Sequence, residues 1–233
     1  MLIFNALEKI EVALRAKITQ RYSEATHDSH WYQDESLFKD DAYMNDGQRV
    51  FKYNTLMEDI EEEVARSDEE FIKHYYRRYS EPDMPPSWMA LEVVSFGSLS
   101  RLYELLVKDE QKKAVAKELG LNKVDILENW MHALSNLRNC CAHHSRIWNR
   151  RFVVNMLLPT NADYPFLDRN TIATTKRNKL FAYLCCIKYI LDIVSPEHNF
   201  YMNFQKLIAE GGSLLSLRDM GFPDNWRGLG IWK

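Results

Sequence analysis

The residues best suited to chemistry lie between Arg138 and Arg151, in the stretch RNCCAHHSRIWNRR. This stretch holds four Arg, two His and two Asn and no acidic residue, although the whole chain has a formal net charge of −3. Arg presents a planar fork of N–H donors that matches phosphate oxygens. His accepts or donates a proton near neutral pH. Together these residue types can cleave RNA without a metal ion, since Arg stabilises the charged phosphorane while His moves a proton.

The same composition has a purely structural interpretation, which the residues alone leave open. Cations near the C-terminus of a helix interact favourably with the helix dipole, so Arg and His there can serve stability only. A zinc pair formed by His143 and His144 is less favoured, because adjacent side chains on a helix point about 100° apart. We therefore predict no metal ion and no cofactor.

One helix, from about Lys123 to about His143, must position the first of these residues. Its apolar residues recur at spacings of three and four, which is typical of a helix with one buried face. The five positions from Arg138 to His143 correspond to about 1.4 turns, so the two side chains do not stack on one face. A single helix can close them around one phosphate only if it ends between them.

Similar periodicity predicts helices along the rest of the chain. Helices are expected to start near Met1, near Asp46, at Ser67 (a capping box with Glu70), at Ser87 and at Ser98 as an N-cap. Further helices are expected over 109–120, ending in Gly120, over about Thr171–Val194 and over Glu197–Glu210. No alternation typical of strands persists. The predicted fold class is therefore all-α, a helical bundle in one domain spanning 1–233. Its motif core lies at about 87–151, further helices lie at about 168–212, and residues 213–233 form an irregular tail.

Composition narrows the class of protein. The net charge counts against a protein that coats duplex DNA, because such proteins carry a global basic excess. The four Cys form two adjacent pairs, Cys140-Cys141 and Cys185-Cys186, which fit neither zinc-site nor disulfide spacing, so we expect reduced thiols. There is no signal-peptide pattern, and no apolar run approaches the roughly 18–20 residues of a membrane span. We expect a cytoplasmic protein.

Three stretches of the chain together resemble a known family. Arg138 to His143 resembles the R-x4-6-H motif of HEPN ribonucleases, with a polar residue directly after the Arg. The stretches EKIEVALRAKI, PPSWMALEVVSFGSLSRLY and RNCCAHHSRIWNR resemble, in order and separation, the Abi-like (abortive infection) proteins of the AbiD and AbiF type. The resemblance covers most of residues 1–150, and the C-terminal third is similar to the family only in being helical.

The resemblance implies an RNase that acts in defence against phage. By position, Arg138 would bind the phosphate, His143 would act as acid or base, and Asn139 would orient one of them by hydrogen bonding. The further candidates for RNA contact are His144, Arg146, Asn149 and Arg150. HEPN sites usually form where two such motifs face each other across a dimer, so we expect a homodimer with a composite basic cleft. An antitoxin or a regulatory RNA is a further candidate partner.

The second resembling stretch carries one residue of special interest. Trp88, Glu92 and Phe96-Gly97 have the spacing of core packing, and Glu92 would then be a carboxylate on an apolar face that needs a partner, such as an Arg of the motif. Abi-like proteins commonly have a further N-terminal segment, whereas this chain begins almost inside its first helix, so we expect a shorter variant or a truncated product. The alternative functions are a non-cleaving RNA-binding module and a helical interaction protein whose tail docks a partner through Trp226 and Trp232.

Overall fold

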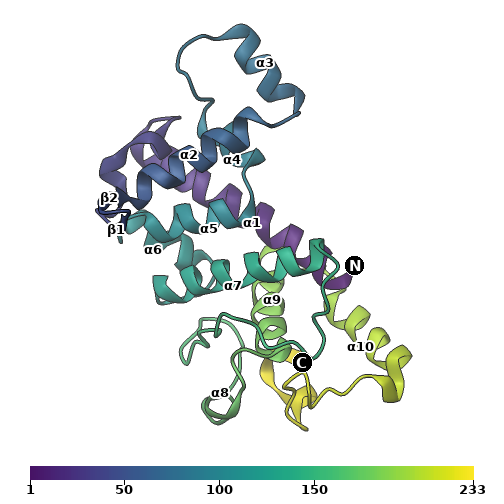
Figure 1. Ribbon diagram of the computed structural model, residues 1–233. Coiled ribbons are helices and arrows are strands. Elements are labelled where there is room, and N and C mark those ends of the chain that lie inside the picture. The colour runs from purple at the N-terminus through teal and green to yellow at the C-terminus, as the bar shows by residue number, and fades with distance from the viewer. The chain divides into compact units, whose positions relative to one another are not determined.

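The computed structural model describes residues 1–233 and is mostly helical (Figure 1). The helices are α1 (Leu2–Thr26), α2 (Lys52–Ala65), α3 (Glu70–Arg78), α4 (Ser87–Val93), α5 (Phe96–Leu105), α6 (Glu110–Glu118), α7 (Val124–Ala142), α8 (Arg169–Thr174), α9 (Leu180–Val194) and α10 (Phe200–Gly211). Short 3-10 helices are η1 (Trp31–Gln33), η2 (Glu35–Leu37), η3 (Gly212–Leu214), η4 (Trp226–Gly228) and η5 (Gly230–Trp232). The all-α prediction is confirmed.

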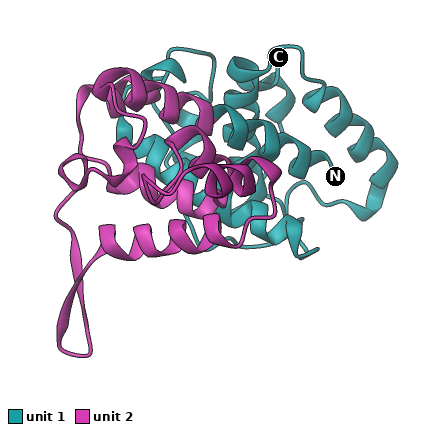
Figure 2. Ribbon diagram, turned by 90° about the horizontal axis from the view of Figure 1, so that it is seen from above, with its two compact units in different colours: residues 1–13, 116–233 teal, residues 14–115 magenta.

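Two compact units make up the chain (Figure 2). Unit 1 consists of Met1–Ala13 and Ala116–Lys233, and unit 2 consists of Leu14–Val115. Helices α1 and α6 each contribute one end to each unit. The single domain expected from the sequence stays a prediction.

Unit 2 is built around α2, which contacts both α4 and α5. Leu56, Ile60 and Val64 are buried at four-residue spacing, so α2 turns one apolar stripe toward its neighbours. The 3-10 helix η1 adds the fully buried rings of Trp31 and Tyr32 to the core of unit 2.

Unit 2 also contains a hairpin that the periodicity did not predict. Strands β1 (Ala42–Asn45) and β2 (Gln48–Phe51) pair antiparallel around Asp46-Gly47, and both turn residues have positive φ, +48° and +81°. An Asp-Gly pair with these angles is typical of a type I′ hairpin turn. The helix expected to start at Asp46 therefore starts only at Lys52.

Unit 1 is built around α9, in which every residue from Leu180 to Leu191 is buried. Helix α7 packs against α9. The C-terminal residues cover another part of this core: Trp226 and Trp232 are only 2% and 1% exposed, and their ring centroids lie 5.4 Å apart. Each ring also lies 6.0 Å from that of Phe204 in α10. The interpretation of these tryptophans as a docking arm is wrong, because they belong to the core of their own unit.

Three predicted helix boundaries are also wrong, each for a local reason. The Ser67 hydroxyl accepts from the N–H of Glu69 only two residues on, so α3 begins without a capping box. Ser95, rather than Ser98, caps α5 by accepting from the N–H of Ser98 at 3.1 Å. The helix expected at Thr171–Val194 is divided into α8 and α9 by the extended residues Thr175 and Lys179.

None of the helices combines the length and the apolar character needed to cross a membrane.

Candidate functional site

Helix α7 carries Arg138 near its C-terminal end, as predicted. Its buried side chains include Leu127, Trp130, Leu134 and Leu137, which face the core of unit 1. Arg138 directly follows the buried Leu137 and lies at the edge of this face, with its side chain 34% exposed. The amphipathic pattern therefore places Arg138 on the boundary between core and solvent.

The end of α7 has the hydrogen bonds of a Schellman motif. The N–H of Ser145 donates to the carbonyl of Cys140 at 2.9 Å, and the N–H of His144 donates to the carbonyl of Cys141 at 3.1 Å. His144 has a φ of +52°, a left-handed conformation that favours glycine. The helix ends at Ala142, and His143 is its C-cap. The helix thus ends between Arg138 and His143. Their spacing requires such an end if both side chains of one chain are to reach one phosphate.

Two residues of α1 hold Arg138 within unit 1. Its Nε lies 3.8 Å from Oε2 of Glu11, whose side chain is 10% exposed. Its Cζ lies 5.8 Å from the ring centroid of Phe4. The Arg138 Nε is itself buried and makes no hydrogen bond. The inner end of the guanidinium is therefore fixed by charge and ring contact, and its accessible surface is at the outer end.

Sequence reasoning missed Glu11 and Phe4, although a signal for Glu11 was present. Glu11 lies four residues after Leu7 and three before Leu14, both of which are fully buried. An acidic residue within an apolar stripe requires a partner, because desolvation of an unpaired carboxylate is costly. Nothing in the sequence pattern identifies that partner as Arg138, more than a hundred residues away.

The side chains of His143 and Asn139 are exposed and make no hydrogen bond in the single chain. Asn139 contributes only its backbone carbonyl, which accepts from the N–H of His143 at 3.0 Å. No hydrogen bond joins either side chain to Arg138. The residues are neighbours along the chain, but one copy alone does not assemble them into a hydrogen-bonded group.

The stretch after His143 runs beside the segment that precedes α9. Oδ1 of Asn149 accepts from Nζ of Lys179 at 3.0 Å. The N–H groups of Phe152 and Met156 donate to the carbonyls of Asn178 and Arg177 at 2.9 and 3.0 Å. These bonds bring two basic segments together, of which sequence reasoning singled out only the first.

The remaining candidates in this stretch differ in their surroundings. His144 and Arg146 are exposed, and Cζ of Arg146 lies 5.9 Å from the ring centroid of Trp148. Trp148 is 38% exposed. Arg150 is half-buried, and its N–H donates to the carbonyl of Ile147 at 3.2 Å. Arg146 and His144 are therefore available to a ligand, whereas Asn149 is already engaged by Lys179.

Glu92 does not have the environment expected from the sequence. The buried residues of α4 are Ser87, Ala90 and Leu91, so Trp88 and Glu92, four residues apart, share the opposite face. Trp88 is 56% exposed and Glu92 is exposed as well. The expected core packing of Trp88 and the apolar setting of Glu92 are both wrong. A hydrated carboxylate needs no cationic partner.

The cysteines are all free thiols, two of them half-buried at the end of α7 and two fully buried in α9. Burial raises the pKa of the Cys185 and Cys186 thiols and, together with Cys140, that of Cys141. No group of three or more His, Cys, Asp and Glu side chains is arranged to hold a metal ion. His143 and His144 therefore have no third ligand for the zinc pair considered above.

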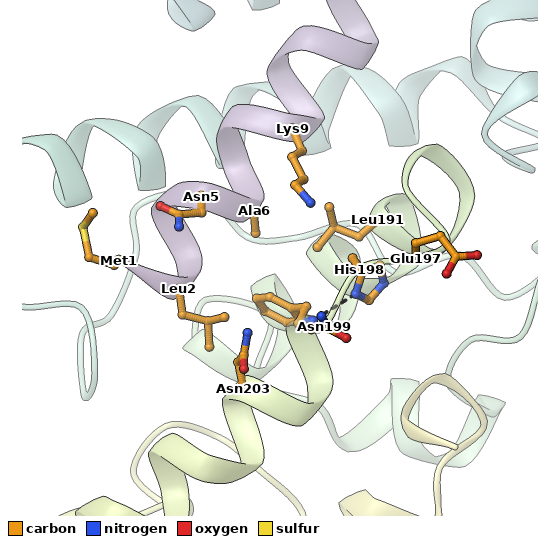
Figure 3. A pocket seen from close by; sticks show the side chains of 11 residues that line it. Met1, Leu2, Asn5, Ala6, Lys9, Leu191, Glu197, His198, Asn199 and Asn203 are labelled. Atoms are coloured by element: carbon orange, nitrogen blue, oxygen red, sulfur yellow. Dashed lines mark hydrogen bonds between the residues drawn. The ribbon is translucent and has the colours of Figure 1, made fainter.

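A pocket of about 490 Å³ is lined by the first turns of α1, by the end of α9 and by the start of α10 (Figure 3). Its α1 residues, Leu2, Asn5, Ala6 and Lys9, project roughly opposite to Phe4 and Glu11 on a helix of 3.6 residues per turn. In the same pocket His198 accepts from the N–H of Phe200 at Nδ1, and its Nε2 lies 2.7 Å from Asp192. Neither Arg138 nor His143 lines this pocket, so it is separate from the motif.

The Abi-like protein family model matches residues 1–149, a region that includes Glu11, Arg138 and His143. No curated protein and no solved structure matched the chain.

Proposed function

The chain belongs to the Abi-like protein family, and we propose that within abortive infection it acts as a metal-independent endoribonuclease of the HEPN type. Family membership implies a role in abortive infection. The observation that carries the catalytic proposal is the end of α7 between Arg138 and His143. The helix end leaves His143 exposed beyond the helix, while Glu11 and Phe4 hold Arg138 just before the last turn.

In the proposed reaction, the ribose 2′-oxygen attacks the adjacent phosphorus and the bond from phosphorus to the 5′-oxygen breaks. The products are a 2′,3′-cyclic phosphate and a 5′-hydroxyl. Arg138 binds the non-bridging oxygens and stabilises the charge that develops on them. His143 either accepts the proton of the 2′-hydroxyl or donates one to the leaving 5′-oxygen. Asn139 would orient one of these groups.

We propose that two copies complete the site. One exposed His143 can hold only one proton at a time, and the single chain offers no second acid or base hydrogen-bonded to Arg138. A two-fold axis near the end of α7 would bring a second Arg and His to the same phosphate. RNA is then the substrate, and a second copy of the chain is the partner that completes the cleft.

The test is incubation of the purified protein with labelled total RNA in EDTA. We expect cleavage with 2′,3′-cyclic ends, a loss of about 10²–10⁴-fold in His143→Ala, and a loss of about 10²–10³-fold in Arg138→Lys, which keeps the charge but loses the fork of donors. His132→Ala is the matched control, because His132 is exposed on the same helix and should be dispensable. Undiminished cleavage in both motif variants would contradict the proposal.

Mixing the natural protein with the His143→Ala protein tests the composite site. If both copies supply His143 to one phosphate, a mixed dimer lacks one of the two His and should cleave poorly, so cleavage should fall more steeply than the fraction of natural protein. A fall in simple proportion, in dimers shown to exchange subunits, would mean that the Arg138 and His143 of one chain act without the partner.

A non-cleaving RNA-binding module is the second candidate, because no hydrogen bond joins Arg138 to His143 within one chain. It predicts salt-sensitive retention of RNA without product, unchanged in His143→Ala.

A further inference from the structure

The segment Lys176–Lys179 belongs to unit 1 and is not part of the proposed catalytic site. The stretch from Arg169 to Lys179 holds four Lys or Arg and no acidic residue, as does the stretch from Arg138 to Arg151. Lys176 and Arg177 are exposed, and Lys179 is half-buried. The chain as a whole has more acidic than basic residues. Two acid-free basic segments that are far apart in sequence are therefore concentrated in one region of one unit.

Backbone and side-chain bonds fix this segment beside the motif stretch. Asn178 and Arg177 accept from the N–H groups of Phe152 and Met156 at 2.9 and 3.0 Å. Lys179 donates to Asn149 at 3.0 Å. The cations of the second segment are therefore held at the far end of the stretch that begins with His143, in a defined position.

Stability does not explain these cations. Lys179 is the N-cap of α9, and Lys176 and Arg177 come just before it. The N-terminus of a helix carries a partial positive charge, so cations there are unfavourable and anions favourable. The first turn of α9 contains no acidic residue, and Lys179 makes no capping bond. This helix start therefore lacks its usual anionic side chains and has an excess of positive charge, which an external polyanion would complement.

An exposed aromatic ring lies in the chain between the motif and this segment. Trp148 is 38% exposed, and Arg146 lies over its ring at 5.9 Å. Trp148 directly precedes Asn149, the residue that binds Lys179. Aromatic rings beside basic side chains are typical of surfaces that bind single-stranded nucleic acid, because an unpaired base stacks on the ring while cations bind the backbone.

We infer that Trp148, Lys176 and Arg177 form a second RNA-binding surface, which stacks one unpaired base and binds the phosphates next to the cleavage motif. This inference rests on the proposed function for its ligand, RNA. It assigns the three residues to binding and none of them to the reaction. Arg146, whose guanidinium lies over the Trp148 indole, would contact the RNA next to the stacked base.

The test measures the affinity of the His143→Ala protein for a fluorescent, unstructured RNA of about 20 nucleotides at several salt concentrations. Lys176→Ala/Arg177→Ala should weaken binding and reduce the slope of log K against log salt by about 1.4, since each phosphate contact on a single strand contributes about 0.7. Trp148→Ala should weaken binding about tenfold with the slope unchanged, because stacking releases no counterion. Trp148→Phe should recover most of the loss, and a fully paired duplex should not respond to Trp148→Ala.

The matched control is Lys206→Ala/Arg218→Ala, which removes two exposed charges from other parts of unit 1 and should leave affinity and slope unchanged. In the cleaving protein, Lys176→Ala/Arg177→Ala should raise KM and leave the single-turnover rate at saturating RNA unaltered. If RNA binds and Arg138→Lys impairs cleavage, yet the Lys176/Arg177 variant matches the control, the second surface is refuted and the proposed function stands. These cations would then be assigned to an acidic protein surface. If the protein binds no RNA at all, both proposals fail together.

Discussion

Replacing His144 by Gly should stabilise the protein. His144 occupies the position after the C-cap of α7 with a φ of +52°, where an L side chain places Cβ close to the following carbonyl. That conformation costs roughly 1–2 kcal/mol for an ordinary residue. Glycine removes the cost but adds roughly 0.5–1 kcal/mol of backbone entropy in the unfolded chain. The expected net gain is therefore about 0.5–1 kcal/mol, or roughly 1–4 °C in Tm for a chain of this size.

The assay is thermal and urea unfolding followed by circular dichroism in 0.5 M NaCl, since salt screens the interaction of histidine charge with the helix dipole. His144→Ala should give no comparable gain, because Ala retains a Cβ at the same φ. His143→Gly should be neutral or destabilising, because His143 has an ordinary φ of −87°. Equal effects of Gly at positions 143 and 144 would refute the reasoning. If His144 also contacts RNA, His144→Gly will cleave more slowly while melting at a higher temperature.

Three further predictions concern other residues of unit 1. Glu11→Gln should lower the cleavage rate roughly ten- to hundredfold by freeing Arg138, because a small misplacement of a group that stabilises the transition state is costly. The melting temperature followed by circular dichroism should change far less. Unchanged cleavage would mean that Arg138 needs no anchor. Gly120→Ala should lower the free energy of unfolding, measured in urea, by roughly 2–4 kcal/mol. The reason is that φ is +63° and the new Cβ would lie 2.5 Å from Cδ2 of Tyr164. A urea midpoint equal to that of the natural protein would contradict this. Burial raises the pKa of the Cys185 and Cys186 thiols, so both should resist iodoacetamide in the folded protein. Mass spectrometry should find the half-buried Cys140 modified first. After unfolding, all four cysteines should be modified.

The elements predicted from the sequence were those whose signals are local. Helix α7 runs from Val124 to Ala142, against an expectation of about Lys123 to His143, because its apolar stripe is regular over five turns. Gly120 has the positive φ expected of a helix C-terminal glycine. The all-α class followed from the same periodicity.

The elements that were missed depend on contacts between distant segments. The residues before Leu180 have helical periodicity, yet Arg177 and Asn178 bind the backbone of Met156 and Phe152 instead, which interrupts the helix. Similarly, the Glu11 carboxylate reaches Arg138 only after the chain folds. Spacing along one helix cannot reveal either contact, so the position of Arg138 on α7 was predicted but the two residues that hold it, Glu11 and Phe4, were not.

Two local features that oppose stability lie in the same region of unit 1. His144 occupies a left-handed position that Gly would fill at lower cost, and Lys176, Arg177 and Lys179 place positive charge at the start of α9. Natural sequences usually satisfy such local rules and depart from them mainly at functional sites. Both departures occur on the two acid-free basic segments that Asn149 and Lys179 join. Their coincidence supports assigning the function to this surface rather than to the pocket beside His198, whose ring nitrogens are both already engaged by the protein.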